Sequence, residues 1–391
     1  MNILLLAPHP FYQERGTPIA VSLLLRVFSE RGDRVSVLTY HEGSDLSFPN
    51  VTIRRIPRLP LVRNIRPGFS LKKVLCDLVM VFHAVRLTKR GGYDVVHAVE
   101  ESVFIAMLLK RLFHIPYVYD MDSSMPQQLV EKSLLFKPLS PIMRWCERRA
   151  VRGADAVIAV CDALAELARR HEPARLTVLR DVSLLPHAQA GTPGPPPTPH
   201  EQRPVRFLYI GNLEAYQGVD LLLRAFALLH QADNLATLTI AGGTPRHVRH
   251  YAARAQTLGI AESVSFEGHQ PVEKMPDLIA DADVLVSPRI KGSNTPMKIY
   301  SYLDAARCVL ATDLPTHTQV LNNDVAMLCD PTPRGMAEAM AILVHDPELR
   351  RRLAQAARKL AAQKYSFEVF KKTLNQLYNA LLAELPSHGH A

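Results

Sequence analysis

Short apolar runs rich in valine, isoleucine and leucine alternate along the chain with longer segments in which apolar residues recur every three or four positions. Alternation of this kind predicts parallel β-sheets that are covered by helices on both faces. The predicted strands fall into two series. The first series comprises residues 2–7, 34–40, 51–56, 94–99, 116–121, 155–161 and 176–181, and the second comprises 205–211, 236–243, 263–269, 283–289, 308–313 and 326–330.

A stretch of different composition separates the two series. The segment HAQAGTPGPPPTPHEQRP has no apolar period and several prolines, as expected of an exposed linker. The length of 391 residues also exceeds what one hydrophobic core usually organises. We therefore expect a Rossmann-like domain over residues 1–183, a linker over 184–204 and a second Rossmann-like domain over 205–365. The amphipathic segment 366–391 is predicted to end the chain as a helix.

Charge adds to this picture because it is unevenly distributed. The net charge is +9, and the segment from Arg54 to Arg90 contains many basic residues and a single acidic one, Asp77. Such a block fits a surface that contacts an anionic membrane, with about 1 kcal/mol contributed by each basic residue. Nucleic acid ranks lower as a partner, since no nucleic-acid motif accompanies the charge. The alternative is that these side chains merely solvate one face of a domain.

The rest of the composition favours a reducing compartment. The cysteines are odd in number and form no CxxC pair, which argues for buried thiols rather than disulfides or zinc ligands. No apolar run reaches the length of a membrane span. The first residues also lack the basic leader and cleavage site of a signal peptide. On these grounds we expect a cytoplasmic protein.

Ligands of open parallel sheets collect at the carboxyl ends of the strands, so the loops that follow strands are the candidate sites. In the first domain, Gly16 allows a turn, and Thr17 is the expected N-cap of a helix that opens with proline, whose amides could bind an anion or a hydroxyl. A plain capped helix is the equal alternative. In the second domain, glycines follow two predicted strands. These are Gly211 with Gly218, and Gly242 with Gly243.

None of these loops matches GxGxxG or GxxxxGK[ST], so hydride transfer and ATP hydrolysis lose their main support. A different loop, GSNTPMKIYSYLDAARCVLATD, follows the predicted strand 283–289. We expect Thr295 as an N-cap and Pro296 as the first helical residue, which leaves the amides of Met297 and Lys298 beside the Lys298 ammonium. Amides, a positive helix end and a lysine predict a diphosphate site, although any capped helix has such amides.

The order of these segments resembles a known family. GTPIAVSLLLRVFSERGDRVSVLTY, FLYIGNLEAYQGVDLLLRAFALL, TLTIAGGTPRH, VSFEGHQPVEKMPDLIADADVLVSPR and NTPMKIYSYLDAARCVLATD are similar, in order and spacing, to glycosyltransferase family 4. The resemblance implies the GT-B fold, an α/β architecture of two doubly wound Rossmann-like domains that face one another across a cleft. It implies transfer of a sugar from a nucleotide-sugar in that cleft, retention of the anomeric configuration and no essential metal. It also implies that the final helix returns to the first domain.

The chain departs from the family at charged positions. Members commonly carry two glutamates, one contacting the sugar and the other the ribose, where this chain has Ser293 and Ser301. The usual arginine and lysine near the diphosphate are replaced by Asn212 and Gln217. These side chains can still form hydrogen bonds. By this comparison, the negative charge of the diphosphate must be neutralised by Lys298 and the helix dipole, which are the expected catalytic groups.

In the first domain the resemblance draws attention to the end of PYVYDMD. Many members place a histidine near the transferred sugar there, and this chain has Asp122. As the second expected catalytic residue, it could hydrogen-bond a sugar hydroxyl or steady positive character at the anomeric carbon, or it could instead cap the next helix. His97 and Glu100, with Glu101, end the preceding strand and are expected on the acceptor side. The sequences Asp120-Met121-Asp122 and Asp281-Ala282-Asp283 imitate a DxD metal signature, which we discount because the GT-B resemblance predicts no such metal.

These features favour a retaining glycosyltransferase that uses a nucleoside-diphosphate sugar as donor substrate and no other cofactor. Its expected acceptor is a lipid-linked or envelope glycan beside the membrane. The competing hypothesis is a binding or scaffold protein that kept the fold and lost turnover, because charged family residues are missing. A sugar-nucleotide epimerase would need acid and base residues that the sequence does not assemble.

Overall fold

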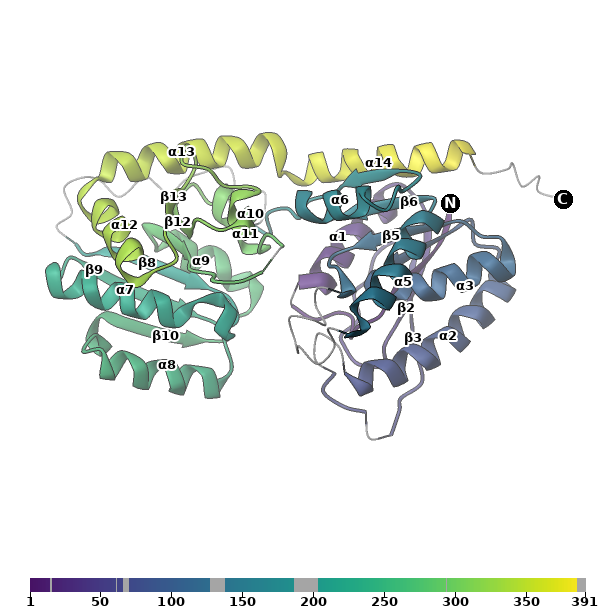
Figure 1. The fold of residues 1–391 in the computed structure, drawn as a ribbon, viewed down its shortest axis with the longest axis horizontal. Coiled ribbons are helices and arrows are strands. Elements are labelled where there is room, and N and C mark those ends of the chain that lie inside the picture. Colours follow the sequence, from purple (N-terminus) through teal and green to yellow (C-terminus); the bar gives the residue numbers. More distant parts are fainter. Residues whose placement is uncertain are drawn as a thin grey trace. The chain divides into compact units, whose positions relative to one another are not determined.

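The computed structural model describes residues 1–14, 16–60, 62–65, 70–126, 138–185, 203–292 and 294–384. Their contacts divide the chain into two units (Figure 1). The first unit is Met1–Arg180 together with Phe370–Ala391, and the second is Asp181–Val369. Of the predicted linker 184–204, the structure describes residues 184–185 and 203–204.

The first unit contains a seven-stranded parallel sheet in the order β3-β2-β1-β4-β5-β6-β7. The strand order reverses at β1, which lies between β2 and β4, and such a reversal is where doubly wound sheets bind ligands. The strands are β1 (Asn2–Ala7), β2 (Arg34–Thr39), β3 (Val51–Arg55), β4 (Val95–Val99), β5 (Tyr117–Met121), β6 (Ala156–Ala159) and β7 (Leu176–Val178). The first predicted series of strands is thus confirmed.

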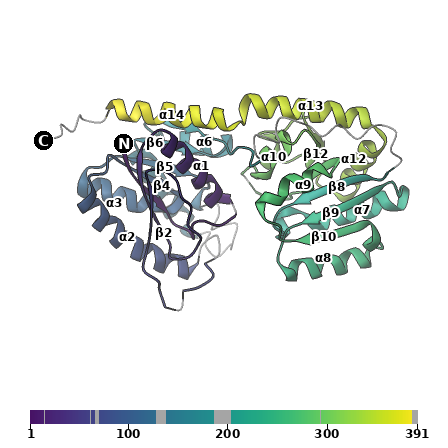
Figure 2. The same cartoon turned by 180° about the vertical axis from the view of Figure 1, so that it is seen from behind.

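Helices cover both faces of this sheet (Figures 1 and 2). One face shares an apolar core with α2 (Leu71–Gly91), α3 (Val103–Phe113), α5 (Ser140–Gly153) and α6 (Asp162–Arg169). Helix α2 begins where Ser70 Oγ accepts a hydrogen bond from the Lys73 amide at 3.3 Å, and it ends at Gly92, whose φ of 53° is left-handed. A short 3₁₀ turn, η1 (Glu100–Ser102), links β4 to α3.

The opposite face of the sheet packs against α1 (Gly16–Glu30) and α14 (Phe367–Glu384). Val96 and Ala98 of β4 belong to the first core, so His97 between them points to this second face. Helix α1 begins at Gly16, so Thr17 lies in its first turn and the predicted Thr17 N-cap is wrong. The prolyl residue that follows is accommodated because first-turn amides have no partner within the helix.

A buried polar network fixes α14 to the sheet of the first unit. The Tyr378 hydroxyl lies 2.7 Å from His97 Nδ1, and His97 Nε2 lies 3.2 Å from Asp120 Oδ2. Because a carboxylate only accepts, Nε2–H donates to Asp120 and Nδ1 accepts from the tyrosine. Phe28 of α1 packs edge-on against the Tyr378 ring at 4.8 Å between centroids. The C-terminal helix is therefore held by both apolar packing and directional bonds.

The second unit contains a six-stranded parallel sheet in the order β10-β9-β8-β11-β12-β13. Its strand order reverses at β8, between β9 and β11. The strands are β8 (Val205–Ile210), β9 (Ala236–Ala241), β10 (Val264–Gly268), β11 (Val284–Ser287), β12 (Cys308–Thr312) and β13 (Met327–Cys329). The second predicted series is confirmed as well.

The helices of the second unit follow the same alternation with its strands. They are α7 (Val219–Ala232), α8 (Pro245–Thr257), α9 (Met275–Ala280), α10 (Lys298–Asp304), α11 (Pro315–Thr318), α12 (Pro333–His345) and α13 (Pro347–Lys364). Thr244, Thr332 and Asp346 cap α8, α12 and α13, each by accepting a hydrogen bond from the amide three residues on, and each is followed by proline.

Aspartates that precede strands hold the amino edges of both sheets. Asp94, Asp155 and Asp283 accept hydrogen bonds at 2.7–2.9 Å from the amides of Asn2, Tyr117 and Arg206, which open or lie in the neighbouring strands β1, β5 and β8. These amides would otherwise end a strand without a partner. An aspartate directly before a strand therefore has a structural role at these three positions.

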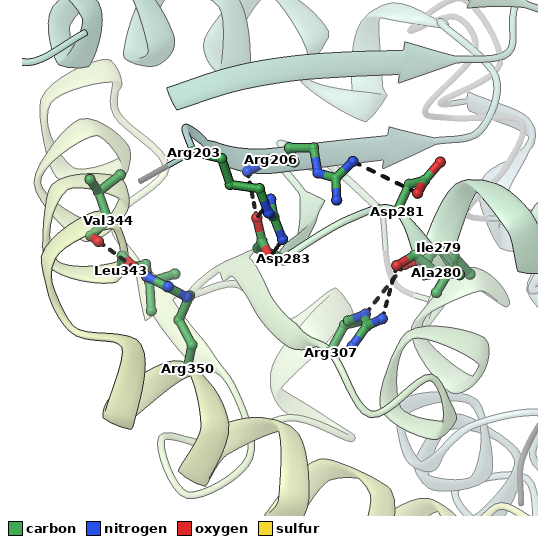
Figure 3. Close-up of polar contacts among 10 residues, drawn as sticks. All are labelled: Arg203, Arg206, Ile279, Ala280, Asp281, Asp283, Arg307, Leu343, Val344 and Arg350. Atoms are coloured by element: carbon green, nitrogen blue, oxygen red, sulfur yellow. Dashed lines mark hydrogen bonds and ion pairs between the residues drawn. The ribbon is translucent and has the colours of Figure 1, made fainter. Parts of the chain in front are cut away.

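The amino edge of the second sheet is densely paired (Figure 3). Asp283 accepts from both terminal nitrogens of Arg203 at 2.9 Å, and Asp281 lies 3.7 Å from Arg206. Nearby, Arg307 donates to the last carbonyls of α9 and Arg350 to those of α12. Asp281 and Asp283 thus serve as ion-pair partners at the amino edge of this sheet.

At the carboxyl edge of the second sheet, loop backbones approach one another closely. A Cβ atom added to Gly242 would lie 1.9 Å from the carbonyl oxygen of Gly211, and one added to Gly218 would lie 1.8 Å from that of Pro288. Both glycines also have left-handed φ angles, 124° and 76°. The loops after β8, β9 and β11 therefore form one compact floor that tolerates no side chain at these positions.

We expect Tyr378→Phe to destabilise the first unit by about 1–3 kcal/mol, because it leaves His97 Nδ1 buried without a partner. Trp145 is the sole tryptophan of the chain and lies in this unit, so its fluorescence during denaturant unfolding measures the change. Asn379→Ala is the control, since it removes an exposed bond from Arg31 one position further along the same helix. Equal stability of the Tyr378→Phe protein and the wild type would contradict an anchoring role.

A second prediction compares two glycines of nearly equal φ. Gly218→Ala and Gly259→Ala both place alanine in the left-handed region, at 76° and 73°, but an added Cβ at Gly259 has nothing within 4 Å. We expect Gly259→Ala to cost about 1–2 kcal/mol from backbone strain alone. Gly218→Ala should cost at least about 2 kcal/mol more, because the backbone of Pro288 cannot move away freely. Hydrogen exchange of the β8 and β11 amides measures both costs, and equal effects would show that the loop approach is not rigid.

Candidate functional site

The ammonium of Lys298 is buried at the carboxyl edge of the second sheet without a hydrogen-bond partner among the described residues. Its Nζ atom lies 3.9 Å from the centroid of the Tyr209 ring at the end of β8. A Cβ on Gly211 would lie 3.4 Å from the same nitrogen, so Lys298 reaches the floor of loops described above. Burial, and then the nearby Arg289 guanidinium, hold the pKa of Lys298 well below its usual range.

Two more buried polar atoms at this edge have no hydrogen-bond partner within the described part of the chain. They are Oε1 of Gln217, in the 3₁₀ turn η3 (Ala215–Gln217) after β8, and Oγ1 of Thr295, in the loop after β11. The two loops are joined, because the Ile290 amide donates to the Tyr216 carbonyl at 3.0 Å. Buried polar atoms are normally hydrogen-bonded, so a cluster of exceptions indicates a place where a ligand supplies the bonds.

Helix α10 does not begin as the sequence predicts. It starts at Lys298 rather than at Pro296, and Met297 rather than Thr295 occupies the N-cap position. The Ile299 and Tyr300 amides bond to the carbonyls of Pro296 and Met297, in the three-residue pattern of a 3₁₀ turn. The N-cap prediction for Thr295 is therefore wrong. Its hydroxyl does not cap the helix and has no hydrogen-bond partner among the described residues.

The structure describes one of the two serines that stand at the family's glutamate positions. Ser293 lies outside the described residues. Ser301 is fully buried, and its Oγ accepts a hydrogen bond from the Leu184 amide at 3.1 Å. The predicted contact between Ser301 and a substrate does not fit this geometry, because the preceding segment of the chain covers the side chain.

The remaining predicted residues of the second unit support the floor. Asn212 folds its loop on itself, since its Oδ1 accepts from the Glu214 amide and its carbonyl accepts from the Tyr209 hydroxyl. Gly243 has a left-handed φ of 81°, and a Cβ there would lie 2.5 Å from the Leu213 side chain. The loops after β8, β9 and β11 thus place the following predicted residues at one edge of the sheet: Gly211, Asn212, Gln217, Gly242, Gly243, Thr295, Met297 and Lys298.

Sequence reasoning missed Arg289, which orders the loop before α10. Its Nη1 donates to the Asn294 carbonyl at 3.0 Å, and its guanidinium lies over the Tyr216 ring at 5.2 Å. Two threonines complete the loop, because Thr312 Oγ1 donates to the Arg289 carbonyl and Thr316 Oγ1 to that of Asn294, both at 2.6 Å. An arginine two residues after the buried strand β11, in DVLVSPR, was the available signal.

His317 was missed as well, and nothing in the pattern of its segment distinguished it from an exposed polar residue. It is fully buried, with Nε2 at 2.9 Å from Ser287 Oγ and Nδ1 at 2.8 Å from the Thr312 carbonyl. Nδ1–H therefore donates to the carbonyl and Nε2 accepts from the serine. Burial lowers the pKa of His317 to about 4, against a bond to Thr312 that raises it. The neutral ring ties the ends of β11 and β12 together.

In the first unit, the predicted His97 contact with a substrate also fails. The His97 ring is fully buried, and both nitrogens are engaged by Asp120 and Tyr378. Asp122 directly follows β5 and is half-buried, at the carboxyl edge where the prediction put it. Gly16 opens α1, the helix that follows β1, and Thr17 follows it.

Glu100 follows β4 at the same edge of the first sheet. It has a positive φ of 48°, and its Oε1 lies 3.4 Å from Ser123 Oγ in the loop after β5. Burial, and then the adjacent Glu101 carboxylate, raise the pKa of Glu100. Glu101 itself pairs with Lys73 of α2. Within the residues that the structure describes, no group of three or more histidine, cysteine, aspartate or glutamate side chains could hold a metal ion.

We expect the second unit to lose stability as pH falls from 6.5 to 4, because unfolding raises the pKa of His317 from about 4 to the ordinary histidine value of 6.5. The unfolded state binds the extra proton, so the loss approaches about 3 kcal/mol. His317→Gln can form the same two bonds without titrating, and should flatten the pH dependence of amide exchange in β11 and β12. His269→Gln, at an exposed position, is the control. An unchanged slope in His317→Gln would refute this assignment.

Known proteins resemble this chain over both units. Residues 15–181 match the Glycosyl transferase 4-like domain, and residues 195–360 match Glycosyl transferases group 1. The α-D-kanosaminyltransferase of Streptomyces kanamyceticus is 26% identical over 351 residues, with coverage of 85% of this chain and 89% of the relative. The phosphatidyl-myo-inositol mannosyltransferase of Mycobacterium leprae is 24% identical over 393 residues, and 97% of each chain is covered.

Solved structures agree with the fold described above. Sucrose-phosphate synthase from Thermosynechococcus elongatus has a TM-score of 0.78 at 18% identity, with coverage of 98% of this chain and 99% of the other. HepE from Anabaena in complex with UDP-glucose has a TM-score of 0.72 at 15% identity, with coverage of 97% and 100%. Each unit of this chain has the Rossmann-like architecture of the GT-B fold. The chain belongs to glycosyltransferase family 4, the group 1 glycosyl transferases.

Proposed function

We propose that this protein transfers a sugar from a nucleoside-diphosphate sugar to a lipid-linked or envelope-glycan acceptor, with retention of the anomeric configuration. The observation that carries the proposal is the buried ammonium of Lys298, which lacks a hydrogen-bond partner among the described residues. It lies where the strand order of the second sheet reverses, beside Gly211 at the end of β8. An anionic ligand would supply the acceptors that this ammonium lacks.

A diphosphate is the anion that suits the reaction. As the glycosidic bond of a sugar donor breaks, negative charge grows on the leaving diphosphate, and a fixed cation beside it stabilises the transition state. HepE, whose structure contains UDP-glucose, shares the fold and supports this ligand class. Lys298 is accordingly the proposed catalytic residue of the second unit. We assign no metal and no cofactor other than the donor to the reaction.

The polar atoms around Lys298 are proposed to bind the rest of the donor. Gln217 can donate through its amide and accept through its unpartnered Oε1, and the Thr295 hydroxyl can do both. The glycine floor lets a ligand approach the backbone without meeting a Cβ. The further donor-binding residues of the proposal are Gly211, Asn212, Gly242, Gly243, Ser293, Pro296 and Met297.

The first unit is proposed to bind the transferred sugar and the acceptor. Asp122 can steady positive character at the anomeric carbon or accept from a sugar hydroxyl. Glu100, whose pKa is raised, can hydrogen-bond an acceptor hydroxyl. Gly16 and Thr17 of the first turn of α1 offer backbone donors to the same ligands.

The acceptor class and the location belong to the same proposal. The Mycobacterium leprae relative is by name a phosphatidyl-myo-inositol mannosyltransferase, which supports a lipid-linked acceptor. None of the described helices combines the length and the apolar character needed to cross a bilayer. We place the protein in the cytoplasm, with peripheral contact to an anionic membrane through the segment Arg54 to Arg90.

A noncatalytic binding protein is the second candidate, and one contact favours it. Ser301 stands where the family commonly has a glutamate, and its hydroxyl is occupied by the Leu184 amide. Such a protein would bind a nucleotide-sugar without releasing nucleoside diphosphate. The two candidates are separated by incubating the purified protein with uridine, guanosine and thymidine diphosphate sugars and measuring binding by thermal shift and release of nucleoside diphosphate. Binding with no release, also in the presence of polyprenyl-linked acceptors, would favour the noncatalytic protein.

The sharpest test of the proposed site is Lys298→Met, which keeps the length of the side chain and removes the charge. Because a buried ammonium without a partner costs stability, the variant should be as stable as the wild type or more stable. Donor turnover should fall by about 100-fold to 1,000-fold, as for the loss of one fixed group that stabilises transition-state charge. Lys274→Ala, at an exposed lysine of the same unit, should change neither. Full turnover in Lys298→Met would remove this residue from the reaction.

A further inference from the structure

The outward face of α2 is apolar although no described part of the chain covers it. Leu71, Leu75, Leu78 and Phe82 recur at spacings of four, three and four residues, so they form one stripe along the helix. Their exposed fractions are 79%, 51%, 63% and 63%. The buried face of the same helix is formed by other residues, including Cys76, Met80 and Ala84. A helix that only rests on a core keeps its outer face polar, so this second apolar face requires an explanation.

The neighbouring helices extend this apolar surface. Helix α2 packs against α3, α3 packs against α5, and all three cover the same face of the first sheet (Figure 1). Leu112 of α3 is half-exposed, and Ile142 and Trp145 of α5 have exposed fractions of 61% and 56%. The Arg149 guanidinium lies over the exposed Trp145 ring at 4.6 Å. We call the exposed side chains of α2, α3 and α5 the docking face.

The charge of the docking face has one sign. Every exposed charged side chain on α2, α3 and α5 is basic. The two acidic residues of these helices are turned inward, since Asp77 is half-buried and Glu147 is buried. Members of the basic set include Lys72, Arg86, Lys89, Arg111, Arg144 and Arg148.

We propose that the docking face binds the surface of an anionic lipid bilayer, with α2 lying in the plane of the interface. The stripe from Leu71 to Phe82 spans about 16 Å at a rise of about 1.5 Å per residue, so its four side chains can enter the headgroup boundary together. The surrounding cations attract anionic headgroups within the same contact. Apolar side chains surrounded by basic ones, with no acidic side chain exposed on the three helices themselves, match a lipid interface in both respects.

This surface differs from the one that the sequence indicates. Both surfaces include α2, but the basic segment Arg54 to Arg90 otherwise contains the end of β3 and the chain before α2, whereas the docking face also includes α3 and α5, which lie beyond that segment. The proposal deepens the acceptor side of the proposed function, since lipid-linked acceptors are presented at such an interface. It rests on the exposed side chains alone, and its test requires no turnover.

The experiment uses the full chain and two kinds of vesicle. One is phosphatidylcholine alone, and the other contains about one-third phosphatidylglycerol as the anionic lipid. We expect cosedimentation with the anionic vesicles, a blue shift of Trp145 fluorescence, and weaker binding at high salt. Leu78→Gln/Phe82→Gln should bind at least about tenfold more weakly, because two apolar side chains no longer leave water. The matched control is Leu228→Gln/Ile342→Gln, which changes two exposed apolar residues of the second unit.

Several results would overturn the proposal. These are no binding of the wild type to anionic vesicles at low salt, equal binding to neutral vesicles, or unchanged binding of Leu78→Gln/Phe82→Gln. A wild type that self-associates without lipid, and loses this association in the same variant, would assign the docking face to a second copy of the chain. Lys298→Met should bind vesicles as the wild type does. Vesicle binding without donor turnover would therefore refute the proposed function and leave the docking face intact.

Discussion

The close approach of three loop backbones at the carboxyl edge of the second sheet is the constraint on which the candidate site depends. Only glycine fits at Gly218 and Gly242, because a Cβ atom at either position would overlap a carbonyl oxygen of a neighbouring loop. The resulting floor has few side chains of its own. Lys298 and Thr295 therefore reach it from the segment after β11, and Gln217 from the segment after β8. Backbone geometry decides which side chains can meet a ligand.

The two edges of the second sheet differ in how well their polar groups are satisfied. At the amino edge, Asp283 pairs with Arg203 and also accepts a hydrogen bond from the Arg206 amide at the start of β8 (Figure 3). At the carboxyl edge, Lys298 and Thr295 are buried and have no such partners among the described residues. Folding stability favours the first arrangement everywhere. Buried polar atoms without a partner also occur elsewhere among the described residues, for example Nε of Arg206 at the amino edge, but at the carboxyl edge they gather in the loops after β8 and β11, as is typical of a functional site.

The strands could be predicted because buried parallel strands appear as continuous apolar runs. Side-chain surroundings could not. Thr followed by Pro marks a true cap at Thr244, yet at Thr295 the same pair precedes a 3₁₀ turn. His97 looked like a ligand at a strand end, but its partner Tyr378 lies 281 positions away in the sequence. Sequence reasoning likewise did not detect that α2 has two apolar faces, of which that of Met80 is buried and that of Phe82 exposed.

The exchange of charged family residues for neutral ones gives Lys298 a different electrostatic task. In a site with several cations and carboxylates, the charges partly satisfy one another before the donor binds. Here Asn212 and Gln217 are neutral, and burial, followed by the charge of Arg289, lowers the pKa of Lys298. The Lys298 nitrogen is stripped of water and fixed in place before a ligand binds, so a diphosphate meets a preorganised donor, and its negative charge favours the protonated form of that nitrogen. One buried lysine on a neutral floor can in this way replace a pair of solvated cations, provided that the ligand brings its proton-accepting oxygens to within hydrogen-bond distance.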